Sequence, residues 1–181
     1  MQKLSLGLLI CFLAASLIKP TSAYRQNAPP KTNAREDAYR ANNLGVALLE
    51  QFKYKEAADS FKGALQLVPD LALARINFGI ALFNVPDLPA AQRELQIAAT
   101  AAPNAPQPAY VLGLIAKTQN RADEAIGYFQ KVLRVDPNDV GANVNLGQLY
   151  AQQRKYSEAV AALRLAVAAE PYNATALYNL G

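Results

Sequence analysis

The chain has 181 residues, enough for one domain with a moderate core, and its alanine-rich, tryptophan-free composition favours helices. The formal net charge is +4, and it falls to +2 when Lys3 and Lys19 of the N-terminal apolar segment are set aside. So small and scattered a charge argues against a nucleic-acid surface. The chain has no histidine, and its one cysteine, Cys11, lies in the same segment. A disulfide, a thiol nucleophile and a Cys/His metal site are therefore excluded from the rest of the chain.

The first 23 residues have the layout of a secretory signal peptide. Lys3 supplies a basic start, residues 4–18 form an uncharged and mostly apolar run, and small residues end the segment at Ala23. This order predicts export with cleavage after Ala23. An uncleaved anchor is the alternative, although a membrane-spanning helix needs about 20 apolar residues. A lipid-modified Cys11 is the third option, and it fits less well because Ile10 before it is not small.

From residue 38 onward the sequence repeats every 34 residues. Residues 24–37 before this array are polar, contain two prolines and show no apolar period, so we expect them to form a flexible linker. The array divides into units 38–71, 72–105, 106–139 and 140–173, and a fifth unit begins at residue 174 and breaks off at residue 181. Three residue types keep the period independently, which indicates an array of structural repeats. These recurring residues are Gly45, Gly79, Gly113, Gly147 and Gly181, then Ala57, Ala91, Ala125 and Ala159, and then Pro69, Pro103, Pro137 and Pro171.

Each unit is predicted to be a pair of helices of about 12 residues, joined by a tight turn and ended by its proline. In the second helix of the first unit, Tyr54, Ala57, Phe61 and Leu65 recur at helical spacing. A glycine inside a helix costs about 0.5–1 kcal/mol relative to alanine. We expect this cost to be offset by close approach of the second helix, at a place where a Cβ atom would clash. The recurring alanine of the second helix would serve the same close contact.

These marks resemble those of the tetratricopeptide repeat family. They are a large apolar residue before each glycine, an alanine early in the second helix, a Phe or Leu four residues later, and the closing proline. The resemblance covers residues 38–181 and implies an all-α fold, a right-handed α-solenoid of antiparallel helix pairs with four full repeats and a truncated fifth. The family's aromatic residue near the start of the first helix is missing, and looser packing is expected where polar residues replace it. The residues at this position are Ala41, Arg75, Ala109 and Asn143.

In the family that this chain resembles, the first helices line a concave groove. One groove position is asparagine in four of the five units, and only Val111 breaks this asparagine row. An amide has two donors and an acceptor, and the resemblance implies that such a row grips the backbone of an extended peptide. The alternative is that these amides bind only water or a neighbouring helix. The row consists of Asn43, Asn77, Asn145 and Asn179.

The other groove positions of the first three units are mostly apolar or aromatic, which favours an apolar extended segment or helix as the ligand. Lys117 also falls on this face, and we expect it to be a solvated residue at the rim. The remaining candidate ligand-binding residues are Val46, Ile80, Phe83, Tyr110, Leu114 and Gln148.

The carboxylates of the array fall at helix starts, turns and exposed faces, where capping and solubility explain them. We therefore expect no enzyme activity, no cofactor and no metal site. The expected function is that of an exported bacterial scaffold, periplasmic or secreted, that binds an extended peptide or a partner protein in its groove. Nucleic acid is not an expected partner, and the membrane is one only through an uncleaved leader.

The alternative function is that of an accessory repeat arm in a larger exported protein or enzyme, whose functional domain lies beyond residue 181. Because residue 181 falls inside a first helix, we expect the array to continue. The repeats are similar to those that precede exported propeller-type domains of the ASPIC/UnbV kind. This similarity is carried by the segments ANNLGVALLEQF and EPYNATALYNLG.

Overall fold

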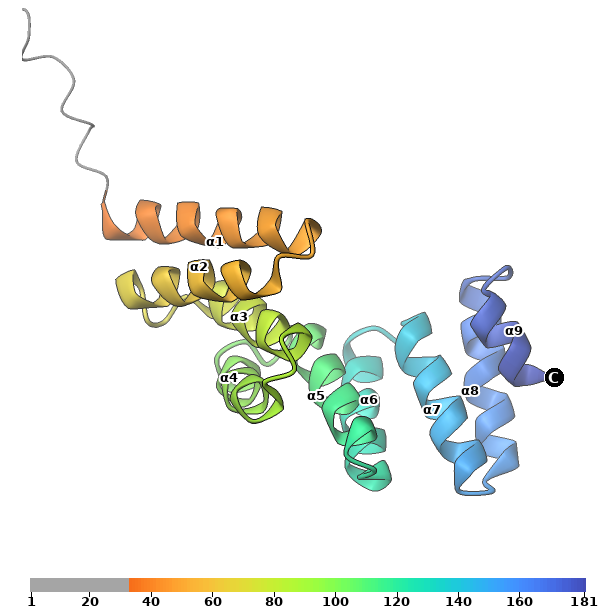
Figure 1. Cartoon of the computed structure of the whole chain (residues 1–181). Helices are drawn as coiled ribbons and strands as arrows, with labels where there is room; N and C mark the ends of the chain where they lie inside the picture. The colour runs from red at the N-terminus through yellow and green to blue at the C-terminus, as the bar shows by residue number, and fades with distance from the viewer. Residues whose placement is uncertain (1–32) are drawn as a thin grey trace, which may run out of the picture. The chain divides into compact units, whose positions relative to one another are not determined.

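The computed structural model describes residues 33–181, and these residues form nine α-helices and no strand (Figure 1). The predicted leader, its cleavage site and most of the predicted linker lie outside the described residues. The all-α prediction is confirmed for this part of the chain. In chain order the helices are α1 (Ala34–Glu50), α2 (Tyr54–Leu67), α3 (Ala72–Asn84), α4 (Leu88–Ala101), α5 (Pro106–Thr118), α6 (Ala122–Val135), α7 (Val140–Gln152), α8 (Tyr156–Ala169) and α9 (Ala174–Leu180).

The helices form pairs that keep the period of the sequence. The first helices α3, α5, α7 and α9 begin 34 residues apart, and so do the second helices α2, α4, α6 and α8. The first helices α1, α3, α5 and α7 each pack on the second helix of their own pair, and each second helix packs on the first helix that follows it. The predicted α-solenoid of helix pairs is therefore confirmed.

The first helices also contact one another, but not equally. The backbones of α1 and α3, of α3 and α5, and of α7 and α9 approach closely, whereas those of α5 and α7 approach each other less. The space between α5 and α7 is consequently spanned by side chains.

Helix α1 begins at Ala34, inside the segment that the sequence assigned to the linker. Asn33 caps it, because its Oδ1 atom accepts a hydrogen bond of 2.7 Å from the backbone N–H of Glu36. Glu36 and Asp37 in the first turn favour the positive end of the helix dipole, and Glu36 pairs with Arg40 at 2.6 Å. The sequence did not predict this helical turn, because these residues are polar and show no apolar periodicity.

The glycines of the first helices make room for the second helices, as predicted. A Cβ atom at Gly147 would lie 2.5 Å from Cγ of Leu163, and one at Gly45 would lie 2.5 Å from Cε1 of Phe61. The equivalent contacts are Gly79 with Leu95 at 2.6 Å and Gly113 with Phe129 at 2.9 Å. The close partner is therefore the Phe or Leu that follows the alanine by four residues, while the alanines themselves are buried beside it.

The two polar residues that replace the expected aromatic are bonded rather than loosely packed. Arg75 pairs with Glu94 at 2.5 Å and donates to the carbonyl oxygen of Pro69 at 2.7 Å. Asn143 is fully buried and donates to the carbonyl oxygens of Pro137 and Asp139 at 3.1 and 3.0 Å. Hydrogen bonds thus take the place of aromatic packing at the start of α3 and α7.

Candidate functional site

The asparagine row is divided into two groups that lie on different helices. In the first group, Asn77 of α3 donates from Nδ2 to Oδ1 of Asn42 at 3.0 Å, and Asn42 donates to Oδ1 of Asn43 at 3.3 Å. Asn42 is only 2% exposed, whereas Asn43 is exposed. This chain of neutral amides joins α1 to α3, and Asn42, which stands outside the predicted row, is its central member.

In the second group the amides are organised around Lys117 of α5. Its Nζ atom donates to Oδ1 of Asn145 and to Oε1 of Gln148, both at 2.7 Å and both on α7. Gln148 in turn donates from Nε2 to Oδ1 of Asn179 of α9 at 3.4 Å. Asn145 and Asn179 also donate to backbone carbonyl oxygens one turn earlier in their own helices. Lys117 thus links α5 to α7, and Gln148 links α7 to α9.

The expectation for Lys117 was wrong. The side chain is half-buried between α5 and α7, and this burial lowers the pKa of its ammonium group below the ordinary value. Its position could not be read from the repeat, because it depends on the distance between two neighbouring pairs. The ammonium group is therefore part-buried on the first-helix side, where two amide oxygens of α7 replace part of its hydration.

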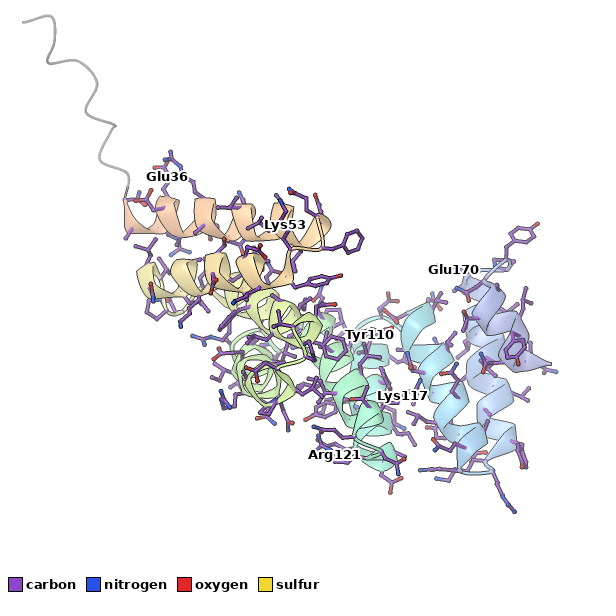
Figure 2. All side chains as sticks on the ribbon, viewed as in Figure 1. Glu36, Lys53, Tyr110, Lys117, Arg121 and Glu170 are labelled. Carbon is purple, nitrogen blue, oxygen red and sulfur yellow. The ribbon has the colours of Figure 1, made fainter. Side chains whose placement is uncertain are left out.

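Tyr110 lies on the same side of α5, two turns before Lys117, and Figure 2 labels both residues where they lie between α5 and α7. Its ring packs edge-to-face on Phe129, with 5.7 Å between the ring centroids. Burial and the negative charge of Asp139 raise the pKa of the Tyr110 hydroxyl, and a hydrogen bond with Asn145 opposes this rise.

Gly141, in the first turn of α7, is the residue that admits this tyrosine. A Cβ atom at Gly141 would lie 2.5 Å from the hydroxyl oxygen of Tyr110, closer than such contacts occur. Gly141 stands outside the 34-residue glycine series. It is a residue of the candidate site that sequence reasoning missed, and its only signal was a helix-breaking residue in a helical turn.

A cavity of about 440 Å³ opens on one side of Tyr110 and is lined by three successive first helices and by α6. Its wall is mainly apolar, with one carboxylate and one amide. A second cavity of about 320 Å³ also includes Tyr110 in its lining. Residues of α7 and the start of α9 line the rest of it, together with Glu170. The residues that line the larger cavity are Ile80, Pro106, Gln107, Tyr110, Val111, Val132, Asp139 and Gly141.

The structure brings some of the predicted groove residues together and leaves others apart. Tyr110, Asn145, Gln148 and Asn179 belong to one bonded cluster, and Ile80 joins Tyr110 at the larger cavity. Val46, Phe83 and Leu114 are half-buried and pack against the core clusters of their own pairs. They therefore contribute mainly to packing between the helices.

Within residues 33–181, no three His, Cys, Asp or Glu side chains gather where they could hold a metal ion. None of the described helices is both long and apolar enough to cross a membrane. The chemistry of the candidate site is that of amides, Tyr110, the half-buried Lys117, Asp139 and an apolar cavity. Such a surface can bind a chain by contact and hydrogen bonding.

The fold defines a class of protein: a scaffold of stacked helix pairs whose first helices share one side. Three tetratricopeptide repeat family models match residues 38–67, 76–140 and 116–180. The chain belongs to the tetratricopeptide repeat family. No curated protein sequence matches the chain.

Several solved structures share this fold. MamA is 25% identical over 76% of this chain and 81% of its own, with a TM-score of 0.69. YrrB, described as a tetratricopeptide repeat protein with an unusual peptide-binding site, is 26% identical over 78% of this chain and 73% of its own, with a TM-score of 0.67. PilF of Pseudomonas aeruginosa, at 16% identity, shows the fold alone, with a TM-score of 0.73 over 82% of this chain and 68% of its own.

Proposed function

We propose that this protein is a non-catalytic scaffold that binds an extended peptide segment of a partner protein on its first-helix side. The observation that carries this proposal is the cavity beside Tyr110, to which α3, α5 and α7 all contribute. A segment that lies along α5 would contact all three helices at this cavity. The description of YrrB, a protein of the same fold, as having an unusual peptide-binding site supports peptide binding as the function.

The chemistry of the cavity fits one apolar side chain of such a segment. Ile80, Val111 and Val132 supply an apolar wall, and the volume of about 440 Å³ lies within the usual range for ligand sites. Gln107 and the Tyr110 hydroxyl at its edge offer polar atoms to a peptide backbone. Burying the apolar side chain would supply most of the affinity, and the polar edge would fix its orientation.

The asparagine row takes a smaller role in this proposal than the family resemblance implies. Asn77, Asn145 and Asn179 already bond to neighbouring helices or to their own backbone. Asn43 is the exposed member, and we assign ligand contact within the row to this residue.

Binding of random linear peptides, displayed and selected on the purified protein, tests the proposal. Selected peptides should bind Gly141→Ala at least fivefold more weakly, because the new methyl group displaces the Tyr110 side chain at the cavity. Gly127→Ala on α6 is the matched control, since a Cβ atom there meets nothing within 4 Å. Gly127→Ala should fold as stably as the parent or better, because alanine favours helix. In Gly141→Ala this gain is offset by the displacement of Tyr110, so circular dichroism is used to verify that both variants are folded. Unchanged affinity for Gly141→Ala, or no selected peptide at all, would overturn the proposal.

We also propose that the protein is exported, on the strength of the signal-peptide layout of residues 1–23. Expression of the full chain in a bacterium should give a mature protein that begins at Tyr24 in the periplasm or the medium. N-terminal sequencing of the fractionated protein measures this. A protein that keeps its leader and stays in the cytosol would contradict export.

A further inference from the structure

The charged residues on the first-helix side restrict which peptide segments can bind there. This inference rests on the proposed function. We propose that the site selects an extended segment in which an apolar side chain fills the Tyr110 cavity and an acidic side chain, on one side of it only, meets Lys117.

Lys117 has hydrogen-bonding capacity that the protein itself does not use. An ammonium group has three donors, and the amide oxygens of Asn145 and Gln148 take two of them. Among residues 33–181, the ion pairs are Arg40–Glu36, Arg75–Glu94 and Arg121–Glu124, and none includes this lysine. A half-buried cation that is held by neutral oxygens has lost part of its hydration without gaining a counter-charge. A ligand carboxylate would supply that charge and accept the third hydrogen bond.

The opposite end of the same site is negative. Asp139, the N-cap residue of α7, lines the larger cavity, and Glu170 lines the smaller one. An acidic side chain at this end would meet like charge, whereas at the other end it meets Lys117. The acidic residue of the ligand is therefore expected on one side of the apolar anchor, and a neutral or basic residue on the other.

The spacing of the two contacts follows from α5. Tyr110 and Lys117 are seven residues apart on one helix, which corresponds to roughly 10 Å along its axis. An extended chain rises about 3.3 Å per residue. The acidic residue should consequently lie about three positions from the apolar anchor.

Parallel selections of random linear peptides on the protein and on Lys117→Gln test this inference. Peptides selected on the parent should share an apolar residue with an Asp or Glu about three positions away. Those selected on Lys117→Gln should keep the apolar residue and lose the acidic preference. Lys62→Gln on α2 removes the same charge from an exposed position outside the site, and it should leave the preference intact.

Fluorescence anisotropy with one selected peptide measures how much its acidic residue contributes to the affinity. Changing its acidic residue to Gln should weaken binding to the parent roughly tenfold, and by less than about twofold in Lys117→Gln. Selected peptides without an acidic preference, or a preference that survives Lys117→Gln, would overturn this inference while leaving the proposed function standing. If no peptide is selected on the parent, both are overturned. Circular dichroism of each variant verifies that its helices are intact.

Discussion

The two middle members of the asparagine row, Asn77 and Asn145, have different surroundings. Asn77 on α3 bonds to the neutral amide of Asn42, between two helices whose backbones lie close together. Asn145 on α7 bonds to the ammonium group of Lys117, between two helices whose backbones lie further apart. The role of a repeat position is thus decided by its neighbour in the next pair. Short amides meet between α1 and α3, whereas the wider spacing of α5 and α7 admits the longer side chains of Tyr110 and Lys117.

The largest expected effect comes from removing the aromatic residue under the cavity. Phe129→Ala should destabilise the protein by about 3–5 kcal/mol, because the ring is fully buried against Gly113 and Tyr110. Phe61→Ala, at the same repeat position in α2, should cost a similar amount. Urea denaturation measures both. Only Phe129→Ala should also weaken peptide binding, and equal binding by the two variants would mean that the cavity is not the site.

The next effect separates glycines that make room for a neighbour from glycines that do not. Gly147→Ala should cost roughly 1–3 kcal/mol, since the added methyl group would overlap Leu163. Gly63→Ala on α2 meets nothing and should stabilise the protein by about 0.5–1 kcal/mol. Thermal unfolding reads both changes. A stabilising Gly147→Ala would show that the two helices of that pair are not in close contact.

The two asparagines can then be compared directly. Asn145→Ala leaves the half-buried Lys117 with one bond fewer and should cost roughly 1–3 kcal/mol. Asn77→Ala removes a bond between neutral amides and should cost about 1 kcal/mol or less. Equal losses of stability in denaturant titrations would contradict the difference drawn between the two regions.

The smallest effect is a dependence of stability on pH. Burial lowers the pKa of Lys117 in the folded protein below its ordinary value of 10.5. Between these two values the unfolded chain holds the proton and the folded protein does not, so stability rises with pH across that window. The raised pKa of Tyr110 acts in the opposite sense above pH 10, which is why Lys117→Gln is compared with the parent at each pH.

The rise should be absent from Lys117→Gln and present in Lys62→Gln. Denaturant titrations at a series of alkaline pH values measure it. Identical pH profiles for the parent and Lys117→Gln would show that the lysine titrates as an exposed group.

The sequence predicted the helix pairs because their determinants are local and repeated. Each glycine, alanine and closing proline constrains its own pair, so the period alone places Gly147 against the helix that begins at Tyr156. The start of α1 was also readable, since Asn33 followed three residues later by Glu36 is a capping signal. The linker prediction overlooked this signal, because it rested on the absence of apolar periodicity in residues 24–37.

The site could not be predicted in the same way. Contact between Lys117 and Asn145, or between Tyr110 and Gly141, depends on how far apart α5 and α7 lie. That spacing results from packing over the whole of two pairs, and no single residue type reports it. The pattern therefore indicated the first-helix side as a candidate surface. It did not indicate that Asn77, Asn145 and Asn179 bond to neighbouring helices or to their own backbone, and it assigned Lys117 to the rim.

Photo-crosslinking tests most directly whether the cavity beside Tyr110 is the binding site. A benzoylphenylalanine in place of Gln107, an exposed residue at the cavity, should crosslink to a selected peptide. The same group in place of Tyr156, exposed on the second helix α8, should not. Crosslinking from position 156 and none from position 107 would contradict the account.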